Sequence, residues 1–88
     1  MLKNRIHPGE SLREVLADRG ITQTRLAAYI GISAGGVYLI CNGRRGISPD
    51  MARKLAAALG TSQELWMNLK ASFDLNRAAQ PEFGLLKV

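Results

Sequence analysis

The sequence predicts an all-α protein: a compact domain of five helices, with a central pair of short helices joined by a tight turn. Apolar residues make up 47% of the 88 residues but aromatic residues only 6%, a balance typical of small helical proteins packed with aliphatic side chains. Three stretches start with a Ser, Thr or Pro helix-start signal and end at a glycine, the usual boundaries of helices. A chain of this length supports one modest core.

The chain divides into three segments. Residues 1–6 are expected to form an extended N-terminal arm, for which the sequence indicates no role. Residues 7–80 are expected to form the folded domain, whose last helix is a dimerisation helix. Residues 81–88 form an apolar tail that starts at a proline, and it either folds back on the domain or meets a partner.

The first helix is predicted to start at Pro8 and to run to about Arg19. Proline loses no hydrogen bond at the first helical position, and Glu10 complements the positive end of the helix dipole. We interpret His7 as part of this helix start, because no Cys or carboxylate at metal-ligand spacing accompanies it. Gly20 is predicted to end the helix.

The segment from Thr22 to Arg45 predicts two short helices joined by a tight turn. Thr22 can cap the first helix and Gly31 can end it, after which Ser33 can cap the second. This spacing is that of a helix-turn-helix, and the alternative is an ordinary helix hairpin with no nucleic-acid role. The residues that fall at the expected offsets are Gln23, Ala27, Gly31, Val37 and Ile40.

Positive charge is concentrated on this central segment. Twelve Lys and Arg against seven Asp and Glu give a net charge of +5 and a pI near 10.0, which favours a polyanionic partner. No acidic residue lies between Asp18 and Asp50. An ordinary solvated face usually mixes the two signs, so the pattern predicts contact with phosphates. The cations in this interval are Arg19, Arg25, Arg44 and Arg45.

A loop from Asn42 to Ile47 follows the central helices. Its two glycines flank Arg44 and Arg45, and glycine allows the backbone to approach a ligand closely. We expect this loop to touch the sugar-phosphate backbone of a nucleic acid. The alternative is a plain surface turn.

Two further helices are predicted after the loop. Ser48 caps the fourth, which runs to about Leu59. Thr61 and Glu64 are predicted to form a capping box for the fifth helix, which spans about 62–76 or further.

The fifth helix has more apolar surface than one core needs. A helix that is apolar on two faces usually has two neighbours, and two-fold dimers are the commonest oligomers. We therefore expect the same helix of a second copy as the second neighbour, with core packing alone as the alternative. The residues assigned to dimerisation are Trp66, Met67, Ala71, Leu75 and Ala78.

Several classes of function are excluded by what the sequence lacks. The single cysteine, Cys41, rules out an internal disulfide and a thiolate metal cluster. The one His, the one Cys and the few carboxylates form no nucleophile, base or metal constellation, so we expect no enzyme, catalytic residue, cofactor or metal. Without an export signal or an apolar run of about 18 residues, the protein is expected in the cytoplasm, associated with the nucleoid and not with a membrane.

Three motifs resemble the HigA-type antitoxins, a branch of the phage-repressor-like (XRE/Cro-type) helix-turn-helix family. They are HPGESLREVL, the NGRRGIS loop and TSQELWMNLKASFDL, and the likeness covers residues 6–76. The resemblance implies a five-helix domain, a homodimer, binding to double-stranded DNA at an operator in its own promoter, and neutralisation of a cognate HigB-type toxin, an mRNA-cleaving endoribonuclease.

The resemblance also implies which residues meet DNA. Gln23 would contact a phosphate, and two copies of the helix over 33–41 would enter successive major grooves about 34 Å apart. The charge pattern adds Arg25 as a phosphate contact. The remaining DNA-binding residues by this resemblance are Ser33, Ala34, Gly35, Gly36, Tyr38, Leu39, Asn42, Arg44 and Arg45.

The recognition helix departs from the family pattern at its start. Family members usually carry Arg, Gln, Asn or Lys at several of the positions that Ala34, Gly35 and Gly36 hold here, because such side chains discriminate base pairs. Each glycine also costs a helix roughly 1 kcal/mol relative to alanine. We expect weaker sequence readout, supplied by Tyr38, by contact of Ala34 with thymine methyls and by DNA shape, and a first turn that allows close backbone approach or adapts.

Two other functions remain open at this point. The domain could be chiefly a protein-interaction module that holds a toxin and has lost most of its DNA readout. It could also be a stand-alone helix-turn-helix regulator without a toxin partner.

Overall fold

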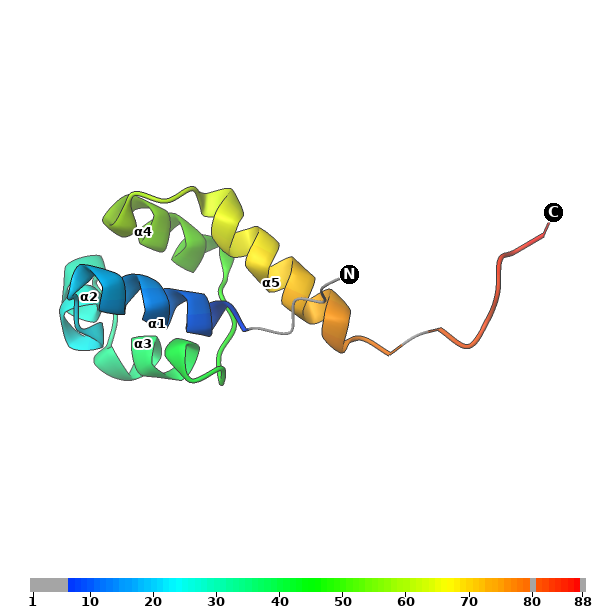
Figure 1. Ribbon diagram of the computed structural model, residues 1–88, viewed down its shortest axis with the longest axis horizontal. Coiled ribbons are helices and arrows are strands. Elements are labelled where there is room, and N and C mark those ends of the chain that lie inside the picture. The colour runs from blue at the N-terminus through cyan, green and yellow to red at the C-terminus, as the bar shows by residue number, and fades with distance from the viewer. Residues whose placement is uncertain (1–6, 80, 88) are drawn as a thin grey trace.

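The computed structural model describes residues 7–79 and 81–87, and the predicted N-terminal arm over 1–6 lies outside them. The described residues form α-helices and no strand, as the sequence predicts. Packing joins α1 to α3 and α5, α2 to α3 and α4, and α4 to α5 (Figure 1). The five helices are α1 (Pro8–Arg19), α2 (Gln23–Ile30), α3 (Ala34–Cys41), α4 (Pro49–Leu59) and α5 (Gln63–Arg77).

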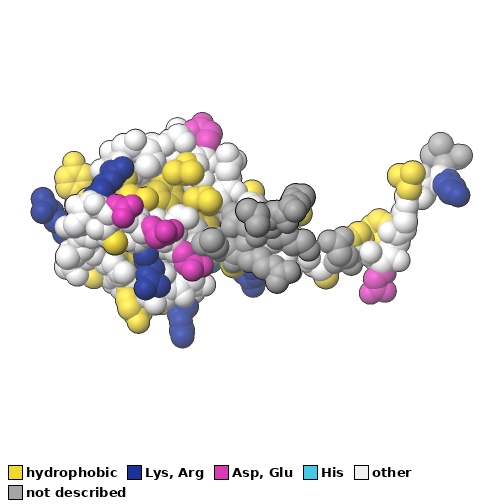
Figure 2. Space-filling view, in the orientation of Figure 1, with side chains coloured by type: hydrophobic (Ala, Val, Ile, Leu, Met, Phe, Trp, Pro, Cys, Tyr) yellow, Lys and Arg dark blue, Asp and Glu magenta, His cyan; other side chains and the backbone are white. Residues whose placement is uncertain are grey.

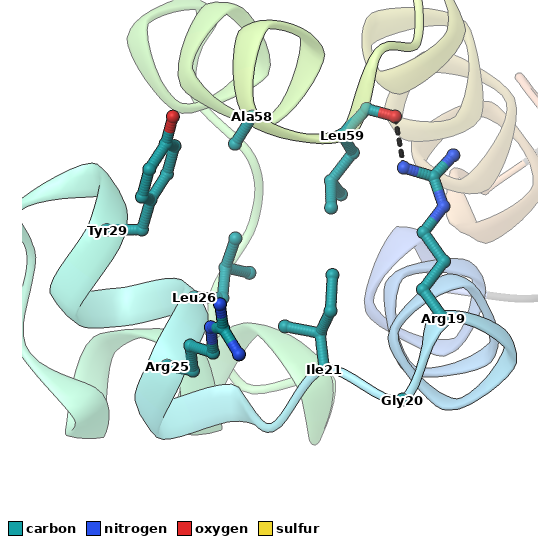
Figure 3. A pocket seen from close by; sticks show the side chains of 8 residues that line it. All are labelled: Arg19, Gly20, Ile21, Arg25, Leu26, Tyr29, Ala58 and Leu59. Carbon is teal, nitrogen blue, oxygen red and sulfur yellow. Dashed lines mark hydrogen bonds between the residues drawn. The ribbon is translucent and has the colours of Figure 1, made fainter.

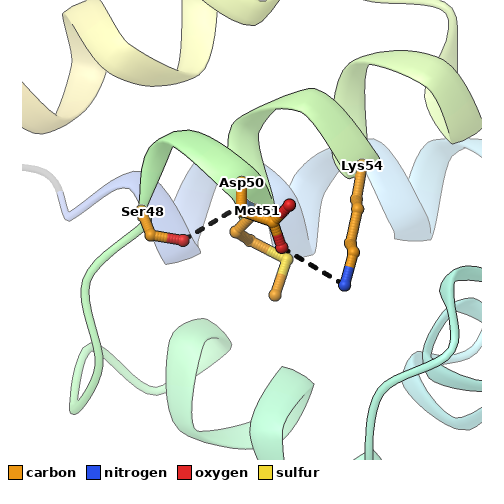
Figure 4. A network of polar contacts seen from close by, with 4 residues as sticks. All are labelled: Ser48, Asp50, Met51 and Lys54. Atoms are coloured by element: carbon orange, nitrogen blue, oxygen red, sulfur yellow. Dashed lines mark hydrogen bonds and ion pairs between the residues drawn. The ribbon is translucent and has the colours of Figure 1, made fainter.

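Four of the helices start with a hydroxyl N-cap. Each capping oxygen accepts a hydrogen bond from the N–H three residues further on, at 3.0 or 3.1 Å, which satisfies a helix donor that has no partner within the helix. Figure 4 shows this bond at the start of α4. The capping residues are Thr22, Ser33, Ser48 and Ser62.

The start of α5 differs from the predicted capping box. Ser62 caps the helix, whereas the Thr61 hydroxyl accepts a hydrogen bond from Trp66 Nε1 at 2.8 Å. A buried indole N–H needs an acceptor, and Thr61 supplies it from the turn just before the helix. The capping box predicted from Thr61 and Glu64 is therefore wrong, because the Thr61 hydroxyl accepts the hydrogen bond of the buried Trp66 indole and Ser62 caps the helix.

Trp66 is the largest fully buried side chain of the described residues, and it joins α5 to the core. Its inclusion among the dimerisation residues is wrong, because a side chain with no exposed surface offers nothing to a second copy. Periodicity places Trp66 beside an apolar stripe of the helix without indicating which stripe faces inward. The buried hydrophobic cluster consists of Leu12, Leu16, Leu26, Ala27, Val37, Ile40, Cys41, Ile47, Ala52, Leu55, Leu59 and Trp66.

The first turn of α1 touches the end of α3 at Gly9. A Cβ at this position would lie 1.8 Å from the carbonyl oxygen of Ile40, a distance that real atoms cannot adopt. Glycine is therefore what lets the two backbones meet. The contact holds the C-terminal end of α3 against α1.

The second half of α5 and the tail lie away from the core. Leu75 is 76% exposed, and Ala71 and Ala78 are exposed as well, whereas Met67 is half-buried. The tail over 81–87 extends beyond α5 and stands clear of the body of the protein (Figures 1 and 2). Its large apolar side chains, Phe83, Leu85 and Leu86, are between 81% and 91% exposed. No helix among the described residues is long and apolar enough to cross a membrane.

Candidate nucleic-acid interface

The α2–α3 unit has the predicted helix-turn-helix geometry. Gly31 ends α2 in the left-handed conformation with φ of 77°, which a side chain would strain. Ile32 N–H then donates to the Ala27 carbonyl at 3.0 Å, and Ser33 caps α3 one residue later. These local bonds fix the direction in which α3 leaves α2.

The outer face of α3 carries no charged side chain. Ala34, Gly35 and Tyr38 are exposed, and Leu39 is half-buried beside them. Val37, Ile40 and Cys41 are buried in the core. The face that could enter a groove is thus small, apolar and marked by one phenol.

Gly36 does not belong to this exposed face, which corrects the prediction made for it. Gly36 is buried, and a Cβ there would lie 3.3 Å from Arg45 Nη1 and 3.3 Å from Ser33 Oγ. Gly35, by contrast, would place a Cβ in nearly open space, 4.0 Å from Ser33 Oγ. The two adjacent glycines therefore have different surroundings.

The loop after α3 presents two arginines, Arg44 and Arg45, at the surface. Asn42 ends α3 and donates from Nδ2 to the Tyr38 carbonyl at 2.8 Å. Arg44 and Arg45 are exposed and take part in none of the ion pairs of residues 7–79 and 81–87. Two unpaired guanidinium groups beside an uncharged helix can bind phosphates or acceptor atoms on base edges.

The comparisons with known proteins agree with this geometry. The sequence profile of the helix-turn-helix family HTH_3 matches residues 12–65. Virulence-associated protein A' of Dichelobacter nodosus is 36% identical over 80 residues, which cover 90% of this chain and 70% of that protein. Antitoxin HigA-1 of Vibrio cholerae is 41% identical over 68 residues, which cover 76% of this chain and 64% of the antitoxin.

Solved structures add the ligand of similar chains. The Pseudomonas aeruginosa antitoxin HigA, solved with the higBA promoter, is 42% identical with a TM-score of 0.79, and the match covers 82% of this chain and 79% of that one. Antitoxin GraA, solved in complex with its operator, is 42% identical with a TM-score of 0.75, covering 85% and 80%. The chain belongs to the HigA-type helix-turn-helix family. Its resemblance to that family, inferred from three motifs, is confirmed.

Within this HigA-type fold, two of the predicted cations, Arg19 and Arg25, line a pocket that α4 borders. Two residues correspond to about 200° around a helix, so Arg25 lies on the opposite side of α2 from the buried Ala27. Arg25 lines a pocket of about 360 Å³ between α2 and the end of α4 (Figure 3). Arg19 lines it too and donates to the Leu59 carbonyl, so it complements the negative end of α4. Both arginines line this pocket together with Ala58 and Leu59 of α4.

The single His and Cys of this HigA-type chain both have structural roles: His7 caps a helix, and Cys41 is buried in the core. His7 Nδ1 accepts a hydrogen bond from Gly9 N–H at 2.8 Å, which confirms its role at the helix start. Burial lowers its pKa, while Asp74 and Glu10 act in the opposite direction. Burial also raises the pKa of the Cys41 thiol, which keeps it protonated and a poor nucleophile. No group of three potential metal ligands occurs in the described part of the chain.

Proposed function

We propose that the protein is the antitoxin of a toxin-antitoxin pair: a homodimer that represses its own operator and neutralises a cognate toxin without being an enzyme. The observation that carries the DNA-binding part is the uncharged outer face of α3 beside the exposed Arg44 and Arg45, which join no ion pair within residues 7–79 and 81–87. Similar chains have been solved with promoter or operator DNA. Because its target is DNA, we place its action in the cytoplasm, on the nucleoid.

In this proposal α3 enters the major groove and the loop holds the backbone. Arg44 neutralises a phosphate and releases its counterion, which makes the affinity depend on salt. Gln23 is half-buried at the first position of α2, and from there it contacts a second phosphate. Tyr38 and Ala34 meet base edges and thymine methyls. Ser33, Gly35, Leu39 and Asn42 complete the contact surface.

The dimer in this proposal forms through the second half of α5. Leu75, Ala71 and Ala78 are exposed there, with Met67 half-buried in the same stripe. An exposed leucine within a stripe of apolar residues is suited to self-association about a two-fold axis. The two-fold axis would place two α3 helices about 34 Å apart on one face of the DNA.

Toxin neutralisation rests on the names of relatives. HigA-1 and GraA are antitoxins by name, and we propose a HigB-type endoribonuclease as the partner of this chain. If the product of an adjacent small reading frame co-purifies with the protein at a fixed ratio, the toxin partner is established. If no such product binds, the protein is a stand-alone regulator.

DNA binding is tested by fluorescence anisotropy on the protein's own upstream DNA and on a scrambled duplex, at two salt concentrations. We expect a preference for the upstream DNA of about a thousandfold or more. Equal binding to both duplexes, with affinity collapsing as salt rises, would contradict a specific repressor. That result would favour a protein-interaction module with weakened DNA readout.

The substitution Arg44→Ala tests the phosphate role of the loop. Binding to both duplexes is expected to weaken by the same factor, and the slope of log K against log salt is expected to fall by about 0.9 for one lost phosphate contact. The measurement is a salt titration of both duplexes. A loss of sequence preference with an unchanged salt slope would contradict the assignment.

A further inference from the structure

The Arg45 guanidinium lies close beside the place that a side chain at position 36 would fill. Its Nη1 atom lies 3.3 Å from the place of a Cβ on Gly36, and Ile32 Cδ1 lies 3.7 Å from that place. Most Cβ atoms keep their neighbours further away than 3.3 Å. A methyl group at position 36 would therefore require the guanidinium to move by a few tenths of an ångström.

The fold of the loop brings Arg45 to this place. Gly43 has a φ of 73°, and Arg44 N–H donates to the Leu39 carbonyl at 2.9 Å, so the chain reverses direction after α3. Ile47 is fully buried and anchors the far side of the loop. The Arg45 side chain consequently reaches back along α3 to its first turn, nine positions earlier in the sequence.

The start of α3 is an electrostatically unfavourable place for the Arg45 cation. The start of a helix carries partial positive charge, so a cation beside it is disfavoured. The first turn of α3 holds no acidic residue, and within the described residues Arg45 joins no ion pair. A cation held against the positive end of a helix is suited to a ligand from outside that offers acceptor atoms.

We propose that Gly36 is a positioning residue, which seats the Arg45 guanidinium beside the first turn of α3 to read a guanine in the major groove. A guanidinium donates two parallel hydrogen bonds to O6 and N7 of guanine. Arg45 thus supplies from the loop the bidentate donor that Ala34 and Gly35 do not provide from the helix. This inference rests on the proposed operator binding, and it separates Arg45 from Arg44, which holds a phosphate.

A double-mutant cycle tests the link between the two residues. The proteins are the wild type, Gly36→Ala, Arg45→Ala and the double variant, each measured by anisotropy on the upstream DNA and on the scrambled duplex. Loss of one bidentate contact is expected to lower the preference about tenfold or more. Gly36→Ala is expected to lose much of the same preference, and the double variant no more than Arg45→Ala alone.

Gly35→Ala is the matched control, because it adds the same methyl group one position away in nearly open space. Its effect on DNA binding is expected to add to that of Arg45→Ala without coupling. Thermal melting of each variant shows whether it is folded, and both alanines favour the helix over glycine. If Gly36→Ala and Arg45→Ala also act additively, Gly36 is only a packing residue and the proposal is overturned.

Arg45→Lys separates base reading from phosphate binding. Lysine keeps the charge but lacks the planar fork of donors. Relative to Arg45→Ala, we expect Arg45→Lys to regain affinity for the scrambled duplex but not the preference for the upstream DNA. Full recovery of the preference would show that Arg45 acts as a point charge and would overturn its assignment to a guanine. Failure of the proposed function is a separate outcome, visible as a wild type without any preference.

Discussion

Helices α3 and α4 start with the same serine cap and then differ in their first turns. Ser33 and Ser48 each accept the N–H three residues further on, at 3.0 and 3.1 Å. In α4, Asp50 follows in the first turn and pairs with Lys54 at 3.3 Å (Figure 4). The first turn of α3 has two glycines and no charge.

The difference lies in which charged side chains stand at the two helix starts. The carboxylate of Asp50 complements the positive end of α4, and Lys54 supports the same turn from four residues further on. The first turn of α3 has no such carboxylate, and Arg45 Nη1 lies 3.3 Å from the place of a Cβ on Gly36 in that turn. Helix α4 thus has an acidic residue at its positive end, whereas the first turn of α3 has none.

The largest effect is expected when α3 is made to resemble α4. Gly35 is the second residue of its helix, as Asp50 is of α4, and Gly35→Asp points into open space. The carboxylate would stabilise the helix start but repel phosphates, at a cost of several kcal/mol. We expect the affinity for the upstream DNA to fall by about a hundredfold or more in anisotropy titrations, with the melting temperature unchanged or raised.

Asp50→Asn is the control for that substitution, because it removes a carboxylate from the corresponding position of α4. It is expected to lower stability by a few tenths of a kcal/mol through the helix dipole. DNA affinity should change little. Wild-type affinity in the Gly35→Asp protein would show that the start of α3 lies away from DNA.

Removing the two serine caps should have a smaller effect. Ser33→Ala and Ser48→Ala are each expected to cost about 1 kcal/mol of unfolding free energy, measured by urea denaturation. Well below the melting temperature, only Ser33→Ala should also weaken operator binding, since its cap orders the turn against which Arg45 lies. Equal losses of DNA binding in both variants would remove the distinction between the helices.

The smallest effect concerns a third helix start, whose cap can be protonated. Only the neutral His7 ring can accept the Gly9 N–H at Nδ1, and burial lowers the pKa of His7 below its ordinary value of 6.5. Below pH 6.5 the unfolded chain therefore binds the proton more readily than the folded protein. The contribution of His7 to stability is fully present above that pH and is lost as the pH falls through the folded-state pKa.

The measurement is the free energy of unfolding between pH 7.5 and 5.5. His7→Asn keeps a capping side chain without titrating in this range, so it is expected to flatten the profile. The carboxylate of Asp74 does not contribute there, because its hydrogen bond from Lys70 keeps the Asp74 pKa below 3.8. An unchanged slope in His7→Asn would assign the pH dependence to other groups.

Local signals predicted the fold almost completely. A side-chain cap, a proline or a glycine marks nearly every helix end, and each acts within about four residues of the chain, so the sequence displays it directly. The helix-turn-helix was predictable for the same reason. Thr61 was not, because the donor that it serves, the indole of Trp66, is recognisable only once the core is known.

The candidate site was less predictable because its parts come from distant positions. Periodicity showed that α5 has two apolar faces but not that Trp66 lies on the inner one. Charge spacing could not distinguish Arg25, which lines the pocket at α4, from Arg44 and Arg45. Two adjacent glycines suggested a close approach, but that the approach involves Arg45 at Gly36 follows only from the reversal of the chain after α3.

The contact between Gly9 and the Ile40 carbonyl has a consequence for genetics. Any side chain at position 9 would displace the end of α3 as a unit, because the obstacle is backbone and not a movable side chain. A library of random substitutions selected for loss of repression would therefore recover changes at Gly9 together with changes at Arg44. Position 9 would then be mistaken for a DNA contact, although what it controls is the angle at which the recognition helix is presented.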